Sequence, residues 1–211
     1  MRVLDLFCGT KSIAKAAKER GHEVITVDND PAHEPDLCAD ILTLGRYPMD
    51  AGYFDMVWAS PPCQRFSVAA ISHNWQKIGD AYRPLNDEAI QAVRLVEHTL
   101  YLIDMLQPCV WFIENPRGML RKLPVMQGLR RHTVTYCQYG DTRMKPTDIW
   151  TNSTLWTPRP ACNNGDPCHV SAPRGSKTGT QGIKGAVDRS RIPSELCKEV
   201  IEAAEKEANP T

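Results

Sequence analysis

The chain has 211 residues, of which 42% are hydrophobic and 24% are charged. This composition excludes a disordered protein and predicts one domain with at most a small accessory lobe; because no apolar run approaches the ~20 residues of a membrane span, we expect a cytoplasmic protein with no membrane partner. The formal net charge is zero, which at first argues against a polyanionic partner.

The charges are nevertheless unevenly distributed along the chain. Residues Asn115 to Arg191 hold 13 Lys and Arg against 4 Asp and Glu, so the rest of the chain is correspondingly acidic. A regional excess of this size is enough to steer and anchor a phosphate backbone. A solvated surface whose charges happen to cluster is the alternative interpretation.

The eight cysteines predict reduced thiols rather than a disulfide framework. Cys8, Cys63 and Cys109 lie in or beside apolar, strand-like segments of an enzyme-like chain. Disulfide frameworks, in contrast, are typical of small secreted proteins. We therefore expect free thiols, at least one of which takes part in catalysis.

The first predicted elements alternate between strand and helix. Val3 to Phe7 form an apolar run that predicts a buried strand, and Ser12 to Arg20 follow with apolar residues on one helical face. Gly9 provides the turn between these two elements. Gly21 ends the helix, and Glu23 to Val27 form a second predicted strand.

The middle of the chain continues this alternation. Phe54 to Ala59 predict a strand that runs into two prolines and Cys63. Gln64 to Pro84 lack periodicity, which predicts a long functional loop. Asn86 is the expected N-cap of an amphipathic helix, and Val110 to Ile113 predict the strand that follows it.

Strands and helices in this order predict an α/β fold with a doubly wound, mostly parallel sheet, whose ligands bind beyond the carboxyl ends of the strands. Residues 151–187 are rich in Pro, Gly, Asn, Ser and basic residues, which predicts a small loop-rich lobe. Pro193 opens a last predicted helix that reaches about Glu207. The predicted units are the main domain (1–150), the loop-rich segment (151–187) and a C-terminal segment (188–211) that returns to the main domain.

Two positions at predicted strand ends indicate chemistry. The Gly9 turn allows close approach of a nucleotide-like ligand, and Asp28, at the end of the second strand, can accept hydrogen bonds from ribose hydroxyls. A structural turn with a surface Asp is the alternative. Cys63 follows a strand, is held by two prolines and faces a loop, which indicates a nucleophile rather than a packed thiol.

Three segments together resemble the signature motifs of the cytosine-5 DNA methyltransferases, in the order of that family. They are Asp5-Leu6-Phe7-Cys8-Gly9, Ser60-Pro61-Pro62-Cys63-Gln64-Arg65-Phe66-Ser67 and Glu114-Asn115-Pro116-Arg117-Gly118. Tyr139-Gly140-Asp141-Thr142-Arg143-Met144-Lys145 resembles a shortened form of the family's basic motif, and Arg191-Ile192-Pro193 resembles its final motif. The resemblance covers residues 1 to about 150 and implies the fold of the S-adenosylmethionine-dependent methyltransferases.

The resemblance also implies a reaction, namely methyl transfer from S-adenosylmethionine to carbon 5 of cytosine in DNA. In this scheme Cys63 adds to carbon 6 as a thiolate, and Glu114 protonates or hydrogen-bonds ring nitrogen 3. Arg143 holds the ring carbonyl or a nearby phosphate. The target base is either flipped out of a duplex or already unpaired. We expect the enzyme to be a monomer.

Two sets of binding residues follow from the resemblance. The implied cofactor residues are Phe7, Cys8, Gly9, Thr10, Asp28, Asn29, Asp40, Ile41 and Pro61. The implied nucleic-acid contacts are Gln64, Arg65, Ser67, Arg117, Lys145, Arg174, Lys177 and Lys184. The chain departs from the family in having Thr10-Lys11-Ser12 where more glycine is usual, Asp28 where Glu is common, and a much smaller recognition region.

Three other functions stay open at the level of sequence. The same chemistry can act on RNA, or on a free pyrimidine nucleotide as in thymidylate synthases, which use a comparable Pro-Cys nucleophile. A catalytically silent relative that only binds DNA is the third. The basic region argues against the free nucleotide, and the presence of Cys63 and Glu114 argues against the silent relative.

A second cluster of candidate ligands lies in the loop-rich segment. Cys162, Cys168 and His169 are candidate ligands of a structural zinc ion, with a fourth ligand such as Cys137 supplied from elsewhere in the chain. Their spacing differs from common zinc motifs, so free thiols in a loop are the alternative.

Overall fold

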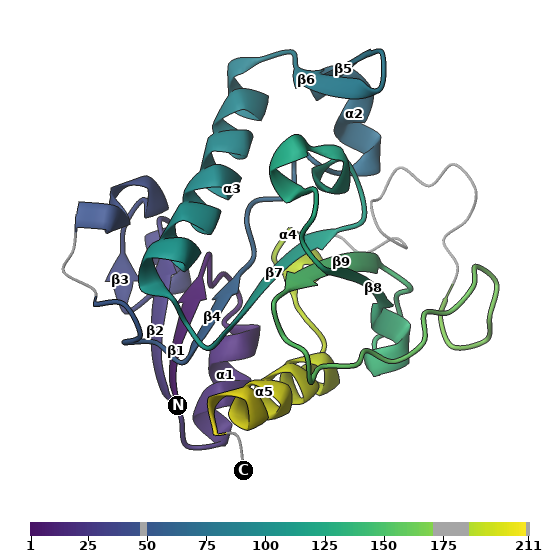
Figure 1. Ribbon diagram of the computed structural model, residues 1–211. Coiled ribbons are helices and arrows are strands. Elements are labelled where there is room, and N and C mark those ends of the chain that lie inside the picture. The colour runs from purple at the N-terminus through teal and green to yellow at the C-terminus, as the bar shows by residue number, and fades with distance from the viewer. Residues whose placement is uncertain (47–49, 171–185, 210–211) are drawn as a thin grey trace.

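The computed structural model describes residues 1–46, 50–170 and 186–209 and has a seven-stranded sheet at its centre (Figure 1). The strand order is β3-β2-β1-β4-β7-β9-β8. The strands are β1 (Arg2–Leu6), β2 (Glu23–Asp28), β3 (Leu37–Cys38), β4 (Met56–Ala59), β7 (Val110–Pro116), β8 (Arg131–Thr135) and β9 (Pro146–Thr151). The five strands from β3 to β7 in this order are parallel, whereas β9 pairs antiparallel with both β7 and β8. The predicted mostly parallel α/β sheet is confirmed, but β3, β8 and β9 were not predicted.

Helices cover both faces of the sheet because the side chains of each strand alternate between two apolar layers. In β1, Leu4 and Leu6 share one apolar cluster with residues of α3, and Val3 shares the other with residues of α1 and α5. The helices are α1 (Ser12–Glu19), α2 (Ile71–Asn74), α3 (Asp87–Leu106), α4 (Ala186–Ser190) and α5 (Ser194–Ala208). Short 3-10 helices are η1 (Pro31–His33), η2 (Ile41–Arg46), η3 (Val68–Ala70), η4 (Leu120–Lys122), η5 (Pro124–Met126) and η6 (Tyr136–Tyr139).

Two polar contacts fix the ends of the long helices. The Asn86 side chain accepts a hydrogen bond from the Ala89 N–H at 2.9 Å, which confirms the predicted cap of α3. Arg20, just after α1, pairs with Glu202 at 3.2 Å and with Glu205 at 2.6 Å, so α5 is held beside α1 (Figure 1). None of the helices in the described ranges is long and apolar enough to cross a membrane.

The segment from Gln64 to Pro84 contains regular structure, whereas its sequence predicted a long functional loop. It contains η3, α2 and an antiparallel ribbon of β5 (Trp75–Ile78) and β6 (Ala81–Pro84), which lies beyond the start of α3 in Figure 1. Buried Trp75 anchors the ribbon, because its ring stacks on Phe66 with centroids 5.9 Å apart and its Nε1 donates to the Arg65 carbonyl at 2.7 Å.

Candidate active site

The strands that carry the three motifs end side by side at one edge of the sheet. β4 lies between β1 and β7, and Leu6, Ala59 and Ile113 stand in one row across them. Beyond the shared row on the β7 side, the buried Asn115 side chain donates from Nδ2 to the Pro61 carbonyl at 2.9 Å. The sheet topology therefore brings the motif segments together.

Cys63 lies just beyond β4 and is partly buried. Its carbonyl accepts hydrogen bonds from the N–H groups of Phe66 and Ser67, both at 3.0 Å, so a tight turn fixes its backbone. Burial of the thiol, and next the charge of Glu114, raise the pKa of Cys63, while Lys145 opposes this effect. The resting thiol is therefore protonated at neutral pH and must lose its proton before it can attack.

Glu114 lies within β7 and is only 6% exposed. Burial raises its pKa, while the charge of Lys145 and a hydrogen bond from Tyr136 act in the opposite direction. In that hydrogen bond the Tyr136 hydroxyl donates to Glu114 Oε1 at 2.9 Å. A buried carboxyl with a raised pKa can carry a proton and deliver it to a ring nitrogen.

Lys145, expected to contact nucleic acid, lies beside this carboxyl and immediately before β9. Its Nζ donates to the Arg189 carbonyl at 2.9 Å and stands 4.5 Å from the centroid of the Tyr136 ring. Burial lowers the pKa of Lys145, and the charge of Glu114 raises it. Lys145 and Tyr136 thus both affect the pKa of Glu114 from the antiparallel edge of the sheet, which consists of β8 and β9. The sequence did not indicate this arrangement because it depends on these two strands, which were not predicted.

Arg143, expected to contact the substrate, is engaged within the protein. Its side chain is buried and forms hydrogen bonds with both carboxylate oxygens of Asp141. It also donates to the backbone carbonyls of Asp188, Arg189 and Arg191, at 3.1, 3.2 and 3.3 Å. Arg143 therefore links the loop before β9 to the segment before α5, and its contact with a cytosine ring stays a prediction.

The turn after β1 has an open outer side. Gly9 and Lys11 have φ values of 45° and 57°, in the left-handed region. The Gly9 N–H donates to Asp28 Oδ2 at 3.0 Å, which ties the turn to the end of β2. Apart from its chain neighbours, the Phe7 carbonyl oxygen, 3.8 Å away, is what a Cβ on Gly9 would meet within 4 Å. A ligand can therefore approach the backbone closely here.

The other predicted cofactor residues differ in accessibility. Asp28 is partly buried and stands 3.3 Å from His33 Nδ1. Asp40 is exposed and its side chain accepts a hydrogen bond from the Leu42 N–H at 3.0 Å. Ile41 is buried in the apolar core. The remaining members are Phe7 and Thr10, both partly buried, Cys8 and Pro61, both buried, and Asn29, which is exposed.

Comparison with known proteins decides the family. The chain is 30% identical to a "Probable DNA (cytosine-5)-methyltransferase" of Frog virus 3 (isolate Goorha), over an alignment of 221 positions that covers 96% of this chain and 99% of the viral protein. The chain belongs to the cytosine-5 DNA methyltransferase family. No family model matches it.

Two solved methyltransferase structures are also similar to this methyltransferase. The S. pombe Dnmt2 methyltransferase is 18% identical with a TM-score of 0.46, over 72% of this chain and 50% of that chain. The Entamoeba histolytica methyltransferase EhMeth is 15% identical with a TM-score of 0.47, over 72% of this chain and 52% of that chain. The chain thus spans about half the length of these two structures.

In this methyltransferase, the predicted nucleic-acid contacts near Cys63 lie at the surface. Gln64, Arg65 and Arg117 are exposed, and Ser67 is partly buried. Arg174, Lys177 and Lys184 fall outside the described residues. The predicted metal ligands Cys162, Cys168 and His169 gather with Cys137 in a separate cluster.

Gly118 joins the loop after β7 to the loop that carries Cys63. The N–H of Met119 donates to the Phe66 carbonyl at 2.6 Å. A Cβ on Gly118 would stand 2.2 Å from the same carbonyl oxygen, which is closer than any real contact of this kind. Only glycine therefore permits this approach between the loops.

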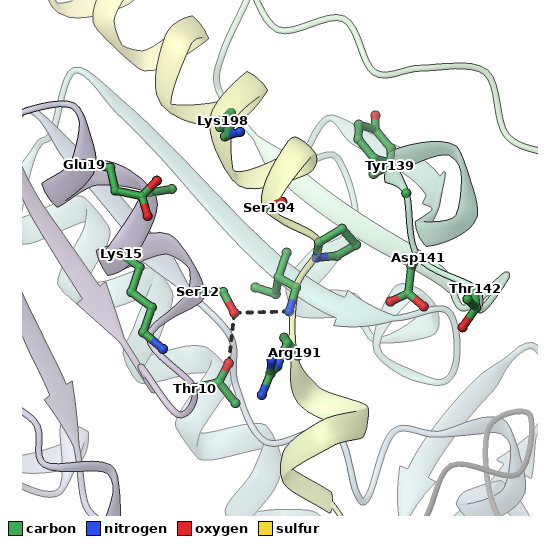
Figure 2. Close-up of a pocket in the computed structure, with 14 residues that line it drawn as sticks. Thr10, Ser12, Lys15, Glu19, Tyr139, Asp141, Thr142, Arg191, Ser194 and Lys198 are labelled. Atoms are coloured by element: carbon green, nitrogen blue, oxygen red, sulfur yellow. Dashed lines mark hydrogen bonds between the residues drawn. The ribbon is translucent and has the colours of Figure 1, made fainter.

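A cavity of about 530 Å³ adjoins the Gly9 turn, between the start of α1 and the start of α5 (Figure 2). Thr10 Oγ1 and Ser12 Oγ are 2.9 Å apart, and the Ile192 N–H donates to Ser12 Oγ at 3.3 Å. The segment that resembles the final motif of the family thus returns to the Gly9 turn. Of the predicted cofactor residues, Thr10 lines this cavity.

Proposed function

We propose that this methyltransferase transfers a methyl group from S-adenosylmethionine to carbon 5 of cytosine in DNA, with Cys63 as the nucleophile. The observation that carries the proposal is the placement of a thiol and a buried carboxyl, Cys63 and Glu114, at adjacent strand ends of a family member. The charge of Glu114 acts on the pKa of Cys63, so the two groups interact electrostatically, which supports a role for both at one substrate ring.

The chemistry follows from the weak nucleophilicity of carbon 5. After its proton leaves, the Cys63 sulfur bonds to carbon 6 while protonated Glu114 donates to ring nitrogen 3, so the ring becomes an enamine that is nucleophilic at carbon 5. S-adenosylmethionine, when bound, supplies an electrophilic methyl group. Once carbon 5 carries the methyl group, water accepts the carbon 5 proton and the Cys63 thiolate is expelled. Ring nitrogen 3 returns its proton to Glu114, which restores the ring.

The residues around the Gly9 turn fit such a cofactor. The outer side of the turn is open, and the partly buried Asp28 carboxylate stands at the end of the next strand. We assign Asp28 to the ribose hydroxyls, where its contact with His33 can be exchanged for hydrogen bonds to the ligand. The exposed residues Asn29 and Asp40 border the same edge.

DNA is the proposed polymer. The support consists of the membership in this family, the excess of basic residues between Asn115 and Arg191, and exposed Arg65 and Arg117 on the two loops that meet beside Cys63. RNA is the alternative, because the reaction on the ring is the same. In either polymer the cytosine must be unpaired or flipped out, at a cost of a few kcal/mol for a duplex.

Trapping with 5-fluorocytosine tests the nucleophile and the polymer together. With fluorine at carbon 5 the final elimination is blocked, so the wild-type chain should remain covalently attached to a DNA oligonucleotide when S-adenosylmethionine is present. Cys63→Ser should form no adduct, and Cys109→Ser, at an exposed thiol, should behave as wild type.

Each outcome has one meaning. An adduct in Cys63→Ser contradicts the assignment of the nucleophile. An adduct with a matched RNA alone moves the substrate to RNA, and DNA binding by wild type without any adduct supports the silent relative.

A further inference from the structure

Four side chains with metal-binding atoms meet beside the antiparallel edge of the sheet. Cys137 lies in η6, and Cys162, Cys168 and His169 come from the loop that follows β9. One ligand atom from each residue lies within 4.8 Å of the corresponding atom of the other three. None of these side chains takes part in the proposed methyl transfer.

Three distances between the ligand atoms match a tetrahedral site. Zinc binds thiolate sulfur at ~2.3 Å and imidazole nitrogen at ~2.0–2.1 Å, which in a tetrahedron separates two sulfurs by about 3.8 Å and sulfur from nitrogen by about 3.6 Å. The Sγ atoms of Cys168 and Cys137 are 3.6 Å apart, and His169 Nδ1 is 3.6 Å from Cys168 Sγ and 3.7 Å from Cys162 Sγ.

The closest pair of sulfurs is not a disulfide. The Sγ atoms of Cys137 and Cys162 are 3.1 Å apart, whereas a disulfide bond measures about 2.05 Å. All four side chains also converge on one centre, because Cys168 and His169 approach the same two sulfurs. A disulfide would use two of the four groups and would leave the other two without a reason to converge.

The loop that carries three of the ligands has little else to fold around. Between Cys162 and Cys168 it is mainly exposed and contains Asn163, Asn164 and Gly165. Hydrogen bonds fix both of its ends, since the Cys162 N–H donates to Thr135 Oγ1 at 3.0 Å. At the other end, the Val170 N–H donates to the Thr142 carbonyl at 2.9 Å. A short polar loop of this kind is typical of sites that a metal ion stabilises.

We propose that Cys137, Cys162, Cys168 and His169 bind one zinc ion. Three thiolates and one imidazole are soft and borderline ligands that suit zinc, and four protein ligands leave no open position for a water or a substrate. The site is therefore structural. It joins the loop after β9 to η6, which begins with Tyr136, the residue that donates to Glu114.

Metal analysis of the purified full chain tests the proposal. Mass spectrometry of the metal content should find one zinc per chain in the wild type. Cys162→Ser and His169→Ala should each lower this ratio severalfold, whereas Cys38→Ser, which removes an exposed thiol outside the cluster, should leave it unchanged. A ratio near zero in the wild type, or equal ratios in all four proteins, would overturn the proposal.

Cobalt replacement needs no variant and so does not depend on the folding of a mutant. Cobalt(II) added to the wild-type chain after chelation should give the intense visible bands of a tetrahedral ion and a thiolate charge-transfer band. Addition of zinc should remove both. Weak bands of an octahedral ion, or a Cys137–Cys162 disulfide found by mass mapping of the untreated protein, would refute the site. These readouts are independent of methyl transfer, so a failure here leaves the proposed activity intact.

Discussion

The parallel half of the sheet (β3, β2, β1, β4 and β7) and the antiparallel edge each affect the pKa of one buried acid, and the effects differ. Asp5 lies in β1, is 2% exposed, and accepts a hydrogen bond from the Ala14 N–H at 3.3 Å. Burial raises its pKa to about 8. Glu114 is similarly buried in β7, but Tyr136 and Lys145 at the antiparallel edge partly restore the stability of its charged form.

This contrast teaches how one sheet can hold two buried acids with different neighbours, of which we assign Asp5 to structure and Glu114 to the reaction. Asp5 accepts its hydrogen bond from the backbone and is held neutral inside the parallel half. Glu114 stands where β7 pairs with β9, so a phenol and an ammonium group counter the effect of burial on it. Neighbouring side chains thus favour the charged form of Glu114, whereas a backbone N–H does so for Asp5.

The sharpest test exchanges the reactive acid for its amide. Glu114→Gln should lower single-turnover methyl transfer to DNA by about 10²–10⁴-fold, because the amide cannot deliver a proton to ring nitrogen 3. The measurement is incorporation of a labelled methyl group. Asp5→Asn is the matched control and should stay within a few-fold of wild type. Equal losses in both variants would erase the proposed distinction between the two acids.

For Asp5 we expect an effect on the free energy of unfolding rather than on methyl transfer. Because folding raises the pKa of Asp5 from 3.8 to about 8, its ionisation opposes folding as pH rises through that range. Urea titration should therefore show wild type losing stability relative to Asp5→Asn, by on the order of a few kcal/mol between about pH 4 and about pH 8. A difference that does not change with pH would show that Asp5 is charged in the folded protein.

A third test concerns the cofactor side of the parallel half. Asp28→Ala should weaken S-adenosylmethionine binding by about 1–3 kcal/mol, because the variant has no carboxylate to accept hydrogen bonds from the ribose. Calorimetry measures the affinity, and Asp30→Ala, at an exposed neighbour, is the control. Unchanged affinity in Asp28→Ala would indicate that Asp28 stabilises the Gly9 turn and does not bind the cofactor.

Removing the Tyr136 hydroxyl should weaken the effect of the antiparallel edge on the pKa of Glu114. The hydrogen bond from Tyr136 lowers the pKa of Glu114, so Tyr136→Phe should raise that pKa further. In the proposed mechanism methyl transfer requires the protonated acid, so the fall of the rate at high pH should move to higher pH, with about a tenfold effect or less at neutral pH. A loss of stability with an unmoved pH profile would mean that the phenol only packs.

The smallest expected effect concerns the basic residues of the segment 171–185. Neutralising Arg174, Lys177 and Lys184 together should weaken DNA binding and make it less dependent on salt, with a slope smaller by about one unit for each phosphate that the variant no longer binds. Cofactor affinity should hardly change. Arg94→Gln, on the exposed side of α3, is the control. An unchanged slope in the triple variant would leave DNA docking to the stretch from Arg117 to Lys145.

Local patterns predicted four of the five strands in the parallel half of the sheet, and missed the short strand β3 and the antiparallel edge. The apolar runs of β1, β2, β4 and β7 and the cap at Asn86 are visible in the sequence because each depends on nearby residues. β9 lacks alternation, since Asp148 is buried in it and is satisfied by an ion pair with Arg121 from η4. No local rule predicts a strand that depends on such a distant partner.

The β5–β6 ribbon and the groups around Glu114 were also missed from the sequence, for different reasons. Gly79-Asp80 between the short strands β5 and β6 is a recognisable hairpin signal, so this miss was avoidable. Cys63 and Glu114 were named from motifs, whereas Tyr136 gains its significance only through contact with a residue 22 positions earlier. The structure also engages Arg143 with Asp141, a pairing that the motif alone does not indicate.

The close approach at Gly118 sets a mutational tolerance that differs from that of other glycines in the chain. At Gly128 and Gly165 nothing lies within 4 Å of an added Cβ, and the left-handed backbone is the remaining constraint, which Asn and Asp tolerate best. At Gly118 any side chain would collide with a backbone oxygen, whatever its polarity. In a library of all single substitutions selected for methylation, position 118 should therefore be depleted of every replacement, alanine included, while positions 128 and 165 retain Asn and Asp.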